Sequence, residues 1–191
     1  MRKTLFIMLI TAVLLLIYSF KNRTDNIDQE QYFILKKIGN IEIREYRESV
    51  NASYYSKEKI DRNNYFKNLA AYIFGDNTEK ANIAMTSPVT MRLYGNREMI
   101  FRMPSNYTLD NLPKANNPKI NFMTIASCTK AAIQYSGYSN KNIEEKKIQE
   151  LKNILEREAI KHDNKFELLV YNSPFKILNR RNEITINIIY P

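Results

Sequence analysis

The sequence holds two segments that echo each other: Ser87-Pro88-Val89, followed by Asn96-Arg97-Glu98-Met99, and Ser173-Pro174-Phe175, followed by Arg181-Asn182-Glu183-Ile184. The glutamate comes ten residues after the proline in the first segment and nine residues after it in the second. Each Ser-Pro pair also follows the end of a predicted helix by a similar interval. We therefore expect two degenerate copies of one structural unit, because repetition at this scale reflects packing geometry.

The hydrophobic pattern around these segments predicts a strand-helix-strand-strand unit in each half. In the first helix, expected at 60–75, apolar residues recur at helical spacing and Gly75 is placed to end it. The second helix is expected at 143–160. Alternating or apolar runs predict strands at 41–46, 51–55, 83–93, 98–103, 119–125, 130–135, 166–171 and 183–189. Many antiparallel strands with two helices predict an α+β fold with a barrel-like sheet.

The N-terminus has the order of an export signal: Arg2 and Lys3, an apolar run from Leu5 to Ile17, and then polar chain. Bulky residues follow the run, so a cleavage site is not evident, and an uncleaved anchor is favoured over a cleaved signal peptide. We expect a signal-anchor or signal peptide with a hydrophobic helix at 1–21, a polar linker at 22–30 and one domain at 31–191. The domain is then membrane-anchored in the periplasm or another exported compartment, or secreted after cleavage.

Composition excludes several classes of function. The chain has 191 residues and a formal net charge of +9, but its basic residues are scattered and form no nucleic-acid-binding motif. Cys128 is the only cysteine and His162 the only histidine, so an intrachain disulfide and a two-histidine metal site are both excluded. Nucleic acid is therefore not expected as a partner.

Seven segments, in the expected order, resemble the SOUL haem-binding family. The segment Ile83-Ala84-Met85-Thr86-Ser87-Pro88-Val89 is similar to the family's most distinctive motif. The other six are 41–46, 72–77, 101–104 with Leu112-Pro113, 135–138, 171–174 and 180–184. The resemblance implies a distorted antiparallel β-barrel made of two similar halves with two flanking helices. It also implies reversible, non-catalytic binding of haem or another tetrapyrrole.

A tetrapyrrole needs an apolar slot, cations for its propionates and, for iron, an axial ligand. On this basis the predicted cofactor-binding residues are Arg62, Tyr65, Phe66, Lys67, Leu69, Tyr72, Met85, Phe175, Arg180 and Arg181. The aromatic and aliphatic members have a competing role in the core, and the arginines and Lys67 are propionate candidates. The iron ligand stays unknown, with His162 as a weak candidate in a loop-like position; a tyrosine or a methionine could ligate instead, and the sequence singles out none of them.

Two alternatives remain open. The basic helix positions of haem-binding relatives fall on Asn63 and Ala71, which cannot neutralise a propionate. A module of the same fold that binds another hydrophobic ligand or a partner, without haem, is therefore the second hypothesis. An enzyme is the third, but Glu98, Glu183, Tyr135 and Cys128 form no readable catalytic arrangement. We expect no enzyme.

Overall fold

The computed structural model describes residues 31–56, 64–95, 97–173 and 175–190. The expected N-terminal helix at 1–21 and the linker at 22–30 lie outside the described residues. Within them, neither helix has the length and apolar composition that a membrane crossing needs.

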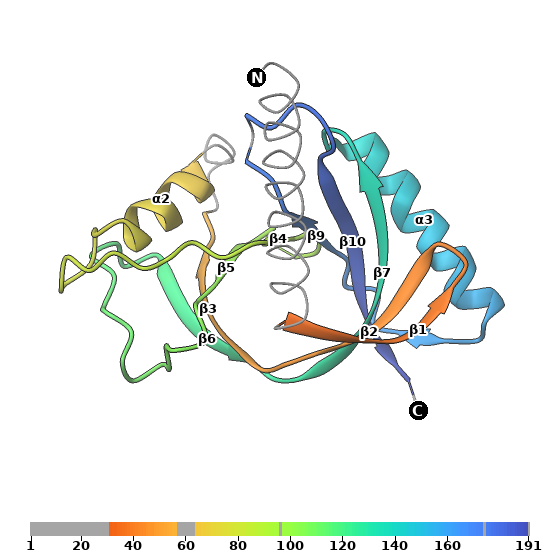
Figure 1. The fold of residues 1–191 in the computed structure, drawn as a ribbon, viewed down its shortest axis with the longest axis horizontal. Coiled ribbons are helices and arrows are strands. Elements are labelled where there is room, and N and C mark those ends of the chain that lie inside the picture. The colour runs from red at the N-terminus through yellow and green to blue at the C-terminus, as the bar shows by residue number, and fades with distance from the viewer. Residues whose placement is uncertain (1–30, 57–63, 96, 174, 191) are drawn as a thin grey trace, which may run out of the picture. The chain divides into compact units, whose positions relative to one another are not determined.

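The described residues form a ten-stranded antiparallel sheet and two helices, which confirms the α+β class (Figure 1). The helices are α2 (Asn64–Ile73) and α3 (Lys141–Arg157). The strands are β1 (Tyr32–Ile38), β2 (Ile41–Tyr46), β3 (Ser49–Tyr54), β4 (Val89–Arg92), β5 (Met99–Arg102), β6 (Ile120–Ile125), β7 (Cys128–Ser136), β8 (Lys161–His162), β9 (Glu167–Val170) and β10 (Arg181–Ile189).

The strands pair in the order β1-β2-β7-β10-β9-β4-β5-β3-β6, and β8 pairs with β10. On one side of the β4–β9 pair, β5 lies between β3 and β4, and α2 connects β3 to the segment before β4. On the other side, β10 lies between β7 and β9, and α3 follows β7. Strands β2 and β6 each pair with a strand of the other half of the sheet. β2 precedes β3 in the chain but pairs with β7, and β6 precedes β7 in the chain but pairs with β3.

The predicted closure into a barrel is wrong. Among the described residues the sheet ends at β1 and β6, which do not pair with each other. Two-residue connections, 47–48 and 126–127, carry the chain between the two sides where closing strands would be required. A connection of this kind has no ladder of backbone hydrogen bonds, so the sheet stays open.

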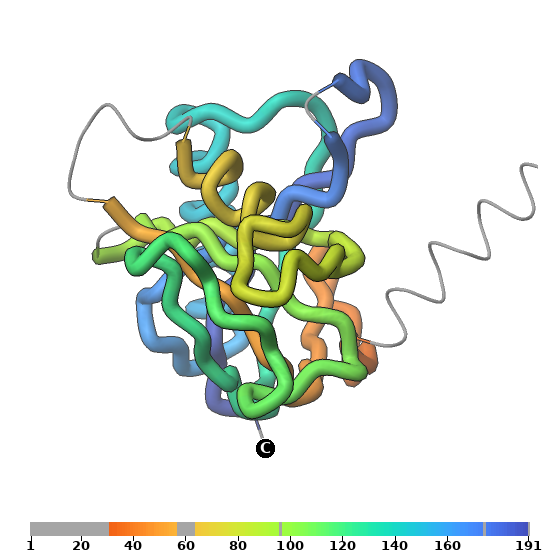
Figure 2. Tube along the Cα trace, turned by 90° about the vertical axis from the view of Figure 1, so that its left-hand side faces the viewer, coloured from red at the N-terminus to blue at the C-terminus, as the bar shows by residue number. Residues whose placement is uncertain are grey.

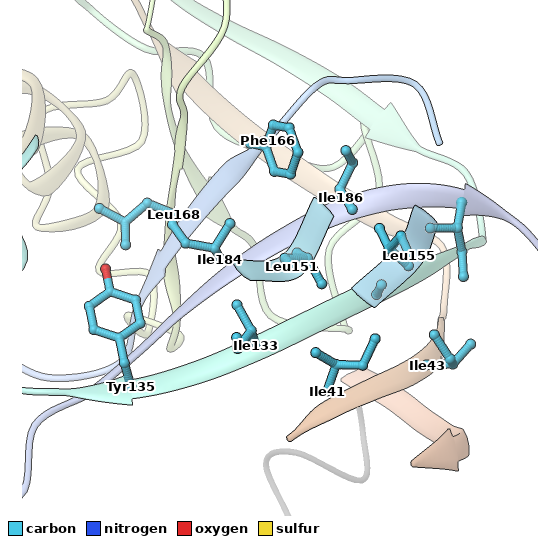
Figure 3. Packing of buried hydrophobic residues seen from close by; sticks show 12 residues of the cluster. Ile41, Ile43, Ile133, Tyr135, Leu151, Leu155, Phe166, Leu168, Ile184 and Ile186 are labelled. Carbon is cyan, nitrogen blue, oxygen red and sulfur yellow. The ribbon is translucent and has the colours of Figure 1, made fainter. Parts of the chain in front are cut away.

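Each helix covers its own hydrophobic cluster. Leu151 and Leu155 of α3 are fully buried against Ile133 of β7 and Ile184 and Ile186 of β10 (Figure 3). The Asn140 side chain accepts a hydrogen bond from the Ile143 backbone N–H (3.1 Å) and begins this helix. A second cluster lies under α2 and includes residues of β3, β5 and β6.

The expected strand at 83–93 is shorter in the structure, where β4 comprises only Val89–Arg92. Pro88 has no backbone N–H to donate, so the ladder begins after it. Residues 83–88 instead have no regular secondary structure and lead directly into β4, with the Ile83 N–H hydrogen-bonded to the Ile73 carbonyl at the end of α2.

Candidate functional site

The outer face of α2 carries an exposed apolar stripe. Leu69, Tyr72 and Ile73 point into the core, with at most 1% exposure. Phe66 and Phe74 are 38% and 64% exposed, and the half-buried Ala70 lies between them. Because the Phe74 N–H donates to the Ala70 carbonyl (3.0 Å), positions 66, 70 and 74 follow one helical path and lie on one face.

Met85 lies beside this helix on the 83–88 segment, and its side chain is 44% exposed. The Ile83 N–H donates to the Ile73 carbonyl at the end of α2 (2.8 Å). The Thr86 hydroxyl donates to the carbonyl of Arg102 (2.6 Å), the residue after Phe101. The Phe101 ring in turn packs edge-on against Phe66, with centroids 5.4 Å apart. The segment that carries Met85 therefore contacts the end of α2 through Ile83 and β5 through Thr86, and Phe66 packs against the same strand.

Three of the predicted contacts are buried in the core. Leu69 has no exposed surface, and the hydroxyl of Tyr65 donates to the Ser56 carbonyl (2.8 Å). The Tyr72 hydroxyl donates to the Pro113 carbonyl (2.9 Å), and burial is the main cause that raises the pKa of Tyr72 to about 12. These side chains position α2 rather than line its outer face.

The predicted arginines are engaged in internal contacts. Arg180 is 6% exposed, and its guanidinium donates to the carbonyls of Ser173 (2.7 Å) and Lys176 (2.8 Å). Arg181 pairs with Glu183 at 2.9 Å. Lys67 is exposed on α2, and Arg62 lies outside the described residues.

Phe175 lies in the loop between β9 and β10, residues 171–180, and is 90% exposed. The Ser87 hydroxyl donates to the Tyr171 carbonyl (2.9 Å), which links the 83–88 segment to the first residue of this loop. The structure thus places Phe66 and Lys67 on α2, and Met85 on the 83–88 segment, which is hydrogen-bonded to the end of α2, to β5 and to the base of the loop that carries Phe175.

His162 belongs to the part of the molecule that α3 covers. It is in β8, which pairs with the end of β10, and its ring packs against Phe166 (6.1 Å between centroids). Its Nδ1 accepts the Asn164 N–H at 3.2 Å. In the described part of the chain, no group of three His, Cys, Asp or Glu side chains could hold a metal ion.

Buried charges occupy the sheet face opposite α3. Glu183 has no exposed surface and accepts hydrogen bonds from Arg44 (2.6 and 3.0 Å) and from the Tyr171 hydroxyl (2.9 Å). Burial alone would raise the pKa of Glu183, but Arg44 and then Arg181 outweigh it and hold the pKa below its ordinary value. This carboxylate therefore stays ionised and joins β2 to β10.

The residues considered for catalysis do not form a reactive arrangement. Glu98 pairs with Arg92, and the two line a small polar pocket of about 230 Å³ at the β4–β5 turn with Tyr55, Tyr94 and Asn121. Burial is the main cause that raises the pKa of the Cys128 thiol, whereas a nucleophilic cysteine needs a lowered pKa.

Sequence reasoning missed Phe74, Ile177 and Leu178, which are 64%, 73% and 77% exposed. The i, i+4, i+8 spacing of Phe66, Ala70 and Phe74 could have identified Phe74 from the sequence. Nothing in the sequence distinguishes Ile177 and Leu178 from core residues, because two adjacent apolar residues are equally consistent with a buried position.

Comparisons with known proteins agree on one relationship. The family model described as "SOUL heme-binding protein" matches residues 27–187. The chain is 28% identical over 137 residues to Heme-binding protein 1 of Xenopus tropicalis, which covers 68% of each protein. It is 27% identical over 124 residues to Heme-binding protein 1 of Xenopus laevis, or 61% of this chain and 65% of that protein. The chain thus spans slightly less than two thirds of the Xenopus laevis relative.

Among solved structures, the EcmrR C-terminal domain superposes with a TM-score of 0.59 at 13% identity. The superposition covers 79% of this chain and 98% of that domain. At this identity, the likeness shows the fold alone.

Proposed function

The chain belongs to the SOUL heme-binding protein family, and from this premise we propose that it binds haem or another tetrapyrrole against the outer face of α2. The observation that carries the proposal is the exposure of Phe66 and Phe74 along α2, together with that of Met85 on the segment whose Ile83 N–H is hydrogen-bonded to the end of α2. Large exposed apolar side chains that adjoin one another mark binding surfaces more often than isolated ones do.

These residues fit the chemical demands of a flat macrocycle. Phe66, Ala70 and Phe74 offer aromatic and aliphatic surface along about two turns of helix, and the Met85 side chain extends it. Lys67, which is exposed next to Phe66, supplies a cation for a propionate. Tyr65 and Tyr72 position α2 without contacting the ligand, because their hydroxyls donate to backbone carbonyls and hold the helix on the core.

Haem, when bound, supplies an iron centre whose properties depend on its axial ligand. Met85 carries the thioether sulfur of this region, and we propose it as the ligand in place of His162. The reason is that His162 packs with Phe166 under α3, whereas α2 covers the other cluster.

Haem titration of the full chain in detergent tests this proposal. We expect a Soret shift at micromolar haem. Phe74→Ser should weaken binding about tenfold, because covering much of a phenyl ring contributes on the order of 1.4 kcal/mol. Ile189→Ser is a matched control, since Ile189 is 76% exposed at the far end of β10. An unchanged Soret band in the wild type would refute haem binding.

The half-buried Ala71 favours a second candidate function. This position of α2 carries no cation, so the propionates of haem depend on Lys67 alone among the described residues of the helix. A module that binds other hydrophobic ligands would tolerate this. If uncharged apolar dyes bind as tightly as haem, and Phe74→Ser weakens both equally, this second function is supported.

We also propose that the domain lies on the exported side of a membrane and has no catalytic activity. The order of charge and apolar residues in 1–21 supports the first statement. The raised pKa of the Cys128 thiol supports the second. Protease added to intact cells or spheroplasts should digest the domain if it faces the exported compartment.

A further inference from the structure

We propose that the β9–β10 loop contacts the surface of a bilayer that contains acidic lipids. Phe175, Ile177 and Leu178 are 90%, 73% and 77% exposed, and in the described chain only Ile189 is comparably exposed among large apolar residues. Figure 2 shows the loop, in blue at the upper right, standing away from the strands that it connects. Three such side chains within four residues form a patch that water solvates poorly.

The loop is held in this conformation from beneath. The buried Arg180 donates to the carbonyls of Ser173 and Lys176, and the Lys176 N–H donates to the Ser173 carbonyl (3.0 Å). The Asn172 side chain accepts the Arg181 N–H at 2.7 Å. The loop backbone is thus fixed by polar contacts while its apolar side chains stay outside, and this arrangement suits insertion into an interface without prior ordering.

The charge of the loop complements an acidic surface. From 171 to 182 the sequence has no Asp or Glu, and Lys176 lies between Phe175 and Ile177. Arg181 is paired with Glu183, whereas the guanidinium of Arg180 contacts backbone carbonyls and the Tyr138 ring, 4.4 Å from its centroid. Positive charge therefore remains beneath and within the apolar patch, as it does in segments that bind anionic lipids.

Two further features favour lipid over another occupant. Tyr138 is 53% exposed beside Arg180, and tyrosine is enriched where apolar tails meet headgroups. The sequence also predicts a membrane segment at 1–21, joined to the domain by the nine residues 22–30, whose extended length is about 30 Å. This second feature rests on the membrane side of the proposed function.

The chain has no tryptophan, so a single substitution creates a specific reporter. Phe175→Trp and Ile189→Trp would be prepared in the full chain and reconstituted into vesicles with phosphatidylglycerol, with and without brominated lipid. Ile189 is the matched control because it ends β10 while the loop precedes it, about 26 Å away along the strand. Both reporters start from exposed side chains, so neither exchange disturbs the core.

We expect the emission of Trp at 175 to shift to shorter wavelength and to be quenched by the brominated lipid, while Trp at 189 shows neither change. Equal behaviour of the two reporters would overturn the proposal. A wavelength shift without bromine quenching would also overturn it, because a second copy or a bound ligand would then cover the loop. Equal quenching in neutral phosphatidylcholine vesicles would overturn the role of charge. The Soret titration above is measured separately, so either proposal can fail alone.

Discussion

Removal of the Arg44 guanidinium should expose how much the buried charges contribute to the fold. The side chains of Arg44 and Glu183 are 3% and 0% exposed, and two hydrogen bonds of 2.6 and 3.0 Å join them across β2 and β10. Arg44→Met keeps the apolar stem of the side chain but leaves the Glu183 carboxylate without its main partner. Loss of one member of a buried pair costs about 3–5 kcal/mol.

The lower end of that range is expected here, about 3 kcal/mol, because Arg181 and the Tyr171 hydroxyl still donate to Glu183. Domains of this size have a free energy of unfolding of about 5–15 kcal/mol, so the loss is measurable and large. Urea unfolding followed by circular dichroism would give the difference from the midpoint at constant slope.

The pH dependence provides a second measurement. The pKa of Glu183 in the folded protein lies below its ordinary value of 4.5, so its stabilising contribution is present above pH 4.5 and is lost as the pH falls further. Without Arg44, burial still raises the pKa of Glu183, and only Arg181 remains as a positive charge that lowers it. The part of the acid-induced loss of stability that comes from Glu183 should therefore be smaller in Arg44→Met than in the wild type, because the folded and unfolded pKa values lie closer together.

Arg157→Met is the matched control, because Arg157 is 66% exposed and pairs with Glu158 at the surface. It should change the free energy of unfolding by less than about 1 kcal/mol. If Arg44→Met costs no more than this control, or loses as much stability in acid as the wild type does, the reasoning about the buried pair is refuted.

Three further results are expected. Leu69→Ala should cost about 2–5 kcal/mol in urea unfolding, because this side chain of α2 is fully buried in the core; a cost below about 1 kcal/mol would mean that α2 is not packed as described. The pKa of Tyr72 is raised from 10.0 to about 12, so the contribution of Tyr72 to stability is complete below pH 10 and is lost as the pH rises through 12. Tyr72→Phe should cost about 1 kcal/mol at pH 7 and should reduce this alkaline loss of stability. An equally steep alkaline loss in the variant would contradict the raised pKa of Tyr72. Arg180→Met should make the 171–180 loop a preferred site of limited proteolysis, whereas an unchanged cleavage pattern would show that the bonds to Ser173 and Lys176 do not hold the loop.

Local patterns predicted much of the fold. Apolar residues at helical spacing predicted both helices, and α2 ends before Gly75, whose φ of 109° is favourable for glycine. The family resemblance, drawn from motifs such as 83–89, is confirmed by the family match over residues 27–187. These signals are local, because helix periodicity and short motifs depend on neighbours within a few residues of the chain.

The sequence predicted only part of the candidate site. Phe66, Lys67 and Met85 were named from the sequence, and in the structure all three are exposed, the first two on α2 and Met85 on the 83–88 segment. Leu69 and Tyr72 are apolar or aromatic like the exposed Phe66, yet the structure buries both of them completely in the core. Without knowing which face of α2 the sheet covers, sequence spacing leaves both orientations open.

The sequence alone determined the residue types, the helices, the α+β class and the exclusion of an intrachain disulfide, since each of these depends on composition or on short-range order. Only the tertiary structure decided that β2 and β6 exchange partners, that the sheet ends at β1 and β6, and that Arg44 meets Glu183 across 139 residues. Pairings of this kind depend on long-range packing and loop closure, which no window of sequence contains.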